Sequence, residues 1–255
     1  MKPMAGLRLF VRQDFEERFT GNVVGTAWAL VLPLLQLGLF GLLFVHVFNA
    51  RAPQDLGAIS YLAFLALAMW PWFAFSEAVG RAATALVDHA GLLGKVAIPY
   101  WQLVLARVVV AFAMHGVGFV LVVLVLAFNG DAIAWSHLPW LLLPWTLLFV
   151  VACCMALGLA TLNVFVRDVA QIVPYLMTAM MFSAPIFFAL SALPEFVSRW
   201  LQLNPVTWPI GTIRQIALGA PWPAGFVVGL TSATAVSLLG IATYLRLRRH
   251  VEDFL

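Results

Sequence analysis

Two ionisable side chains interrupt long apolar runs of this sequence, and such residues are the first candidates for chemistry. Glu77 and His115 each stand in an apolar stretch, where a carboxylate and an imidazole could act as general acid and base. A neutral histidine that bridges two helices is the more frequent case, so we favour a structural role for His115. Together with Arg167, these residues are expected to be too dispersed to form one catalytic site.

Motifs with known chemistry are absent from the sequence. The segment Gly91-Leu92-Leu93-Gly94-Lys95 has the wrong glycine spacing for a GxxxxGK[ST] phosphate-binding loop and lacks the hydroxyl that would bind magnesium. There is no HExxH or GxSxG motif, and the only cysteines are adjacent to each other rather than in CxxC spacing, which is typical of small core residues. The sequence therefore predicts no catalytic residue, no metal site and no cofactor bound by this chain.

The composition is that of a membrane protein. Of the 255 residues, 64% are hydrophobic and 10% are charged, whereas about 25% charged residues are usual in soluble domains. Because a membrane-spanning helix needs about 20 mostly apolar residues, we predict a single all-α membrane domain over residues 1–255 with six spans. The predicted spans are Val23–Val47, Ile59–Gly80, Gln102–Phe128, Leu141–Phe165, Gln171–Leu190 and Gly225–Leu245.

The distribution of Lys and Arg predicts the orientation of these spans. An even number of spans places both termini on one side, and the positive-inside rule assigns that side to the cytoplasm. Of the fourteen Lys and Arg residues, only Arg51, Arg199 and Arg214 then lie outside. The net charge of +3 is explained by this topology, so no nucleic-acid partner is predicted.

Two polar helices are predicted on the cytoplasmic side. Residues 1–22 contain LRLFVRQDFEERF, an amphipathic helix expected to lie on the inner leaflet. Residues 81–99 are predicted to form one short helix that ends at Gly91 and Gly94 and at which a soluble partner could dock. Glu77 is expected to face headgroups or Arg81. The polar face of the second helix consists of Arg81, Asp88, His89 and Lys95.

Aromatic residues and prolines mark two further regions. Aromatic side chains surround Pro71 in the second predicted span, where they could line a pathway beside a kinked helix or simply pack, and packing is the simpler interpretation. Residues 191–223 are apolar but contain several prolines. They predict two short helices in a re-entrant or interfacial hairpin on the outer side, with Arg214 at the headgroup layer. The candidates for channel lining are Trp70, Trp72, Phe75 and Phe182.

The order of these features resembles the permease subunits of ABC type-2 exporters, most closely those that export O-antigen, teichoic acid and related polysaccharides. The resemblance covers nearly the whole chain. It is carried, in order, by VRQDFEERFTGNVVGTAWALVLPLL, LLGKVAIPYWQLVLARV, NVFVRDVAQIV with SAPIFF, and LNPVTWPIGTIRQIALG. It implies a homodimer of permeases that encloses a channel, with two separate ATPase subunits that bind ATP and Mg.

The resemblance also implies roles for individual residues. In that family the N-terminal helix and the loop after the second span contact the ATPase subunit, and the short helices before the last span form an outer gate. The corresponding contact residues here are Arg12, Asp14, Arg18, Asp88, His89 and Lys95, and those of the gate are Asn204, Pro205 and Arg214.

The function expected from the resemblance is export of a lipid-linked polysaccharide, such as O-antigen or capsule, across the bacterial inner membrane. An exporter of a small hydrophobic compound or drug would share the same six spans and is the alternative within the family. A membrane-embedded enzyme that modifies lipid is the alternative of another class.

Overall fold

The computed structural model describes residues 3–19, 27–53, 59–93, 99–222, 225–251 and 254, and none of these residues is in a strand. In this part of the chain four helical segments are long and apolar enough to cross a membrane. They are α3 (Tyr61–Ala82), α6 (Tyr100–Phe128), α7 (Leu142–Phe165) together with the preceding 3-10 helix η4 (Trp135–Leu141), and α11 (Phe226–Leu247). The predicted all-α membrane class is confirmed.

Two of the six predicted spans correspond to shorter apolar helices. Helix α2 (Trp28–Gly41) continues as the π-helix η2 (Leu42–Val47), and residues 20–26 before it lie outside the described part. The predicted fifth span is α8 (Val169–Ser183), which ends earlier than expected because Ala184 is extended ahead of Pro185. The count of six spans therefore stays a prediction.

Helix α3 lies at the centre of the fold. It packs against α2, α6, α7, α8 and α10 (Thr207–Ala217), and the segment from Phe64 to Ala68 has no exposed surface. Ser60 caps its first turn by accepting a hydrogen bond from the Ala63 N–H at 3.0 Å. Because the first two-thirds of this helix are apolar on every side and largely buried, it forms the core of the protein rather than a lipid-facing surface.

Glycines allow two close helix contacts. The indole of Trp70 in α3 lies against Gly118 in α6, where an added Cβ would be 2.6 Å from the indole nitrogen. Between α7 and α11, a Cβ on Gly158 would be 2.8 Å from the Cα of Gly240. Small residues at such contacts let membrane helices approach closely without a side chain between them.

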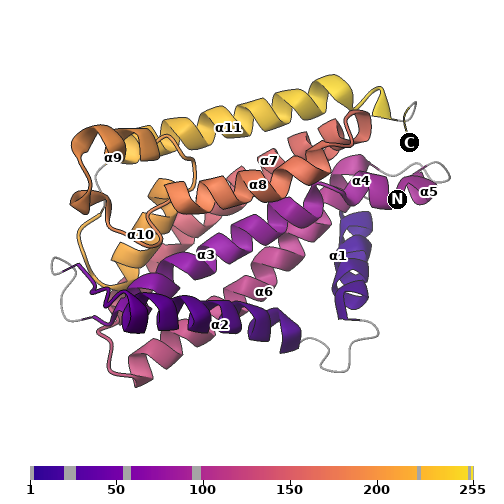
Figure 1. Cartoon of the computed structure of the whole chain (residues 1–255). Helices are drawn as coiled ribbons and strands as arrows, with labels where there is room; N and C mark the ends of the chain where they lie inside the picture. The colour runs from indigo at the N-terminus through magenta and orange to yellow at the C-terminus, as the bar shows by residue number, and fades with distance from the viewer. Residues whose placement is uncertain are drawn as a thin grey trace.

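The two ends of the molecule carry different elements (Figure 1). Helix α1 (Pro3–Phe19), α4 (Ala85–Asp88), α5 (Ala90–Leu93) and both ends of the chain gather at one end, which we call the α4 end. Helices α9 (Glu195–Leu201) and α10 (Thr207–Ala217) lie toward the opposite end, which we call the α9 end. The arrangement of helices therefore keeps the two chain ends together.

The prediction of a single helix over residues 81–99 is wrong. Helix α3 runs on to Ala82, and two separate one-turn helices, α4 and α5, follow it. Gly91 lies inside α5 rather than ending a helix, and Gly94 lies outside the described residues. At the end of α3, Nη1 of Arg107 donates to the carbonyl oxygen of Arg81 at 2.6 Å and satisfies a carbonyl that has no partner within the helix.

Candidate functional site

An ion-pair network joins α1, α3, α4 and α6 at the α4 end. Nη2 and Nη1 of Arg81 donate to the Asp14 carboxylate at 2.9 and 3.2 Å, and Nε of Arg107 lies 3.7 Å from the same group. Nη1 of Arg107 also donates to Asp88 at 2.8 Å. The side chains of Asp14 and Arg107 are 10% and 13% exposed, so each charge is held mainly by the others rather than by water.

Glu77 and His115 extend this network along α3 and α6. Nε2 of His115 lies 2.8 Å from a Glu77 oxygen, and Nη1 of Arg81 lies 3.9 Å from the other Glu77 oxygen. The bridging role predicted for His115 and the approach of Glu77 to Arg81 are confirmed. The expectation that Glu77 and His115 are dispersed is wrong, because α3 and α6 pack side by side. Arg167 is exposed, on the turn after α7.

This arrangement does not resemble a catalytic or metal centre. Among the described residues no three His, Cys, Asp or Glu side chains are close enough to hold a metal ion. The oxygens of Asp14 and Asp88 accept hydrogen bonds from arginines, so both carboxylates have a structural role in the ion-pair network. From sequence, Arg107 is only one of the Lys and Arg residues predicted on the cytoplasmic side, although a charged residue within LVLARVVVAF is a signal that it has a partner.

The residues predicted to contact an ATPase subunit divide into accessible and buried ones. Arg12 is 79% exposed and is hydrogen-bonded to Glu16 at 2.7 Å, which raises the pKa of Arg12. Asp88 is 45% exposed, and Nδ1 of His89 lies 2.9 Å from the carbonyl oxygen of Ala85. Asp14, by contrast, is turned into the network. The side chain of Arg18 and all of Lys95 lie outside the described residues, and the contact itself stays a prediction.

Helix α1 packs differently from the predicted interface helix. Gly6, Phe10 and Asp14 are buried one turn apart on one face, and this face lies on α6. Leu9 and Phe15 remain exposed. A Cβ on Gly6 would collide with the side chain of Gln102. The helix is therefore docked on the protein, with part of its apolar surface still available to lipid.

The predicted gate residues tie α10 to α8 and α3. Nδ2 of Asn204 donates to the Met180 carbonyl oxygen and to Oγ of Ser183, both at 2.9 Å, and the neighbouring Pro205 is buried. The guanidinium carbon of Arg214 lies 3.8 Å above the ring of Phe64. These contacts place Asn204 and Arg214 between helices.

The prediction that Arg214 lies at the headgroup layer is wrong. The residue is only 4% exposed, and its Nη1 donates to the Pro185 carbonyl oxygen at 2.9 Å. An aromatic face and a carbonyl oxygen together hold the cation inside the protein. Helix α10 is accordingly a buried element, with ten of its eleven residues in the interior.

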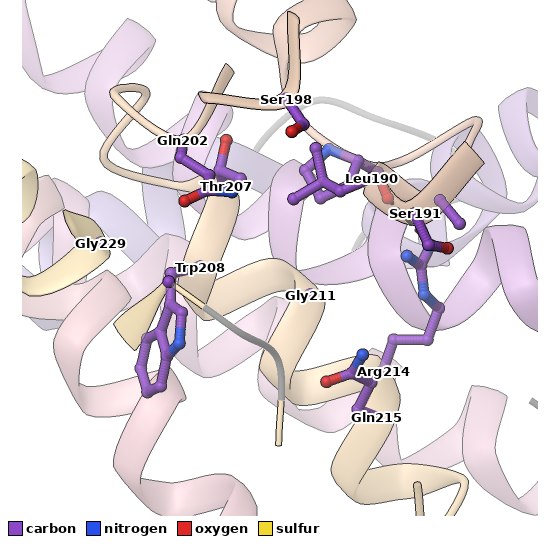
Figure 2. A pocket seen from close by; sticks show the side chains of 13 residues that line it. Leu190, Ser191, Ser198, Gln202, Thr207, Trp208, Gly211, Arg214, Gln215 and Gly229 are labelled. Carbon is purple, nitrogen blue, oxygen red and sulfur yellow. Dashed lines mark hydrogen bonds between the residues drawn. The ribbon is translucent and has the colours of Figure 1, made fainter. Parts of the chain in front are cut away.

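A cavity of about 310 Å³ lies beside Arg214. It is bounded by the chain after α8, by α9 and α10, and by the first turn of α11. Figure 2 shows Gln202 and Thr207 at the upper left, the indole of Trp208 below them, and Arg214 and Gln215 at the lower right. Trp208 and Gln215 could not be identified as site residues from sequence, because their position after Asn204-Pro205 carries no chemical signal.

The aromatic residues predicted to line a channel occupy different environments. Trp70, Trp72 and Phe75 are 1%, 3% and 0% exposed inside a single chain, whereas Phe182 is 58% exposed. The ring of Phe182 stacks on Phe187 with the centroids 5.7 Å apart. In this conformation Phe182 is the one of the four that lies on the surface, and the channel stays a prediction.

Comparison with known proteins identifies the family. Residues 6–218 match the ABC-2 type transporter family. The chain is 28% identical to the O-antigen export system permease protein RfbA of Myxococcus xanthus, over 91% of this chain and 88% of that protein. It is 24% identical to the polysialic acid transport protein KpsM of Escherichia coli, over 92% and 90% of the two chains, and 22% identical to an O-antigen export permease RfbA of Klebsiella pneumoniae, over 98% and 94%. Because the match covers most of its length, this chain belongs to the ABC-2 type transporter family.

Proposed function

We propose that this chain is the membrane permease subunit of an exporter that moves a polysaccharide. The observation that carries the proposal is that relatives named for O-antigen export and polysialic acid transport align along about nine-tenths of this chain and of their own length. The described helices are those of a multi-pass membrane protein. The chain has no phosphate-binding loop in its sequence, so ATP and Mg are bound by a separate subunit.

The finer assignments follow from the two ends of the fold. In the proposed assembly, two copies enclose a channel and export a lipid-linked polymer across the inner membrane, with the α4 end in the cytoplasm. The excess of Lys and Arg in the segments at that end supports this orientation. The opposite end, with Asn204, Pro205 and Arg214, is then the outer gate.

The α4 end is proposed as the docking surface for the ATPase subunit. Arg12 and Asp88 offer exposed charges there, and both belong to helices that the Asp14 and Arg107 contacts fasten to α3 and α6. Force applied to α1 or α4 therefore acts on buried ion pairs, and not on a flexible loop.

Deletion of the gene tests the proposed substrate class. We expect the deletion strain to lose its surface polysaccharide and to accumulate polymer inside, with both restored by the wild-type gene. The lone purified permease should hydrolyse no ATP, and its complex with the ATPase subunit should hydrolyse it. Unchanged surface polysaccharide together with increased sensitivity to hydrophobic compounds would instead favour the small-compound exporter.

Charge reversal at one exposed position tests the docking surface. Arg12→Glu reverses an exposed charge at the α4 end and leaves the residues of the buried network unchanged. Arg199→Glu is a matched control, because Arg199 forms the same kind of exposed i,i+4 pair, with Glu195, at the α9 end. We expect Arg12→Glu to reduce co-purification of the ATPase subunit and Arg199→Glu to leave it intact. Equal recovery of the ATPase with both variants would contradict a contact at Arg12.

A further inference from the structure

The cavity beside Arg214 has the size of a small-molecule site. Its volume of about 310 Å³ falls at the lower end of the roughly 300–1,000 Å³ that is usual for ligand pockets. Its walls come from segments that are separate in sequence, namely the chain after α8, helices α9 and α10, and the start of α11. It is therefore a feature of the folded chain and not of one loop.

Two buried polar atoms in the cavity wall lack a protein partner. Trp208 is 4% exposed, and its indole nitrogen forms no hydrogen bond. Oε1 of Gln215 is likewise buried without a partner. Figure 2 shows the nitrogen-bearing edge of the Trp208 ring on the side of the cavity where Gln215 lies. Native proteins seldom leave buried donors and acceptors unpaired, so the cavity presents one donor and one acceptor to whatever occupies it.

The remaining wall offers an aromatic face and further polar groups. The Trp208 ring lies beside the rings of Trp222 and Phe226, with centroids 6.3 and 4.9 Å away. Gly229 has no side chain, and the side chain of Trp208 occupies the space that a Cβ there would need. The hydroxyl of Thr207 donates to the Leu201 carbonyl oxygen at 2.7 Å, which leaves its oxygen able to accept. The Arg214 guanidinium adds a buried positive charge to the cavity wall.

We propose that this cavity binds one sugar residue of the exported polymer. A pyranose ring presents hydroxyl groups that both donate and accept, and these match the unpaired Trp208 nitrogen and Gln215 oxygen. Arg214 suits a hydroxyl or a carboxylate on the ring. A lipid tail would leave the polar atoms unpaired. The inference rests on the proposed function, because it takes the ligand to be the polymer, and its principal rival is a cavity filled with ordered water.

Binding to the purified complex tests the inference directly. The permease and its ATPase subunit are placed in lipid nanodiscs, free of sugar-based detergent. Oligosaccharides of two to six units, released by partial acid hydrolysis of the cell's own exported polysaccharide, are titrated by calorimetry and by saturation-transfer NMR. We expect saturable binding, with weaker binding of maltotriose as an unrelated oligosaccharide.

Two substitutions remove the unpaired atoms while keeping the size of each side chain. Trp208→Phe retains an aromatic ring without the N–H, and Gln215→Leu removes the amide oxygen. Each is expected to weaken oligosaccharide binding about 3–10-fold, which is the usual range for one lost hydrogen bond. Trp222→Phe is the matched control, because Trp222 contacts the Trp208 ring but does not line the cavity. Thermal melting of each complex shows whether the variants fold.

The outcomes separate this inference from the proposed function. If gene deletion abolishes polymer export and the wild-type complex binds no oligosaccharide, the cavity holds water and only this inference fails. Wild-type affinity in folded Trp208→Phe and Gln215→Leu variants would equally overturn it, as would equal binding of maltotriose, which would mark a site for sugars in general. Unchanged export in the deletion strain would overturn the proposed function itself.

Discussion

Removal of the Asp14 carboxylate is expected to loosen α1 from the membrane helices. Arg81 donates two hydrogen bonds to this carboxylate, at 2.9 and 3.2 Å, and Nε of Arg107 lies 3.7 Å away. With Asp14→Ala, both guanidinium groups lose an anionic partner. Arg107 keeps Asp88 and the Arg81 carbonyl oxygen. Arg81 keeps the Glu77 carboxylate, but at 3.9 Å, so it loses its two closest bonds to a carboxylate and carries most of the loss.

The burial of these groups sets the size of the effect. Removal of one partner from a fully buried ion pair costs about 3–5 kcal/mol, and a hydrogen bond to a charged group contributes about 1.5–3 kcal/mol. The side chain of Arg81 is 31% exposed, so water can replace part of what it loses. We therefore expect Asp14→Ala to lower the free energy of unfolding by about 2–3 kcal/mol, and the melting midpoint by about 4–12 °C.

A double-mutant cycle isolates the contact. Asp14→Ala, Arg81→Ala and the double variant are melted as purified complexes, and the coupling energy is expected to be about 1.5–3 kcal/mol. Glu16→Ala serves as the control on the same helix, because its pair with Arg12 is exposed, and it should leave the midpoint unchanged. A coupling below about 0.5 kcal/mol would refute the interpretation of this network as the anchor of α1.

Three further predictions concern packing, the transport path and orientation. Gly240→Ala should lower the melting midpoint, because its Cβ would collide with the backbone of Cys154, whereas Gly38→Ala, which meets open space, should not. Phe182→Ala, at an exposed ring, should reduce polymer export without lowering the melting midpoint. Trp70→Ala should lower the free energy of unfolding by the roughly 3–5 kcal/mol usual for a buried aromatic residue, and with it the midpoint. The opposite pattern would mean that Phe182 only packs. Glu195→Cys, in a background without native cysteines, should react with an impermeant thiol reagent in intact cells, and labelling confined to inverted vesicles would contradict the proposed orientation.

The long apolar helices could be predicted from sequence because their signal is local. The prediction Gln102–Phe128 corresponds to α6 at Tyr100–Phe128, and Leu141–Phe165 corresponds to α7 at Leu142–Phe165. Each needs only a run of apolar residues long enough to cross the membrane. The early end of α8 was also encoded locally, in Ala184-Pro185, since a residue before proline is disfavoured in the helical conformation. Apolar composition alone, which continues to Leu190, therefore overestimates the length of this helix.

The candidate sites depend on contacts between distant parts of the chain, and sequence gave little access to them. Arg214 was expected among headgroups because its short helix was predicted to lie in an outer re-entrant or interfacial hairpin, yet Phe64 and the Pro185 carbonyl oxygen bind it inside the fold. Glu77 and His115 were recognised as unusual, but their hydrogen bond requires the packing of α3 on α6. Ionisable residues were thus correctly identified as important, while their partners could be found only in the structure.

Helix α3 connects the two sites that these residues form. Near its last turn, Glu77 and Arg81 hold His115 and Asp14, and near its first turn Phe64 lies under the guanidinium of Arg214. Its 22 residues span about 33 Å at the rise of an α-helix, and they are packed on nearly every side, so the helix resists bending except at Pro71. In the proposed assembly, a displacement of α1 or α4 by the ATPase subunit would therefore be passed along α3 to α10 and the cavity beside it. Pro71 lies inside α3 and has no backbone N–H to bond to the preceding turn. It is therefore the position in the interior of this helix where the two halves can tilt relative to each other.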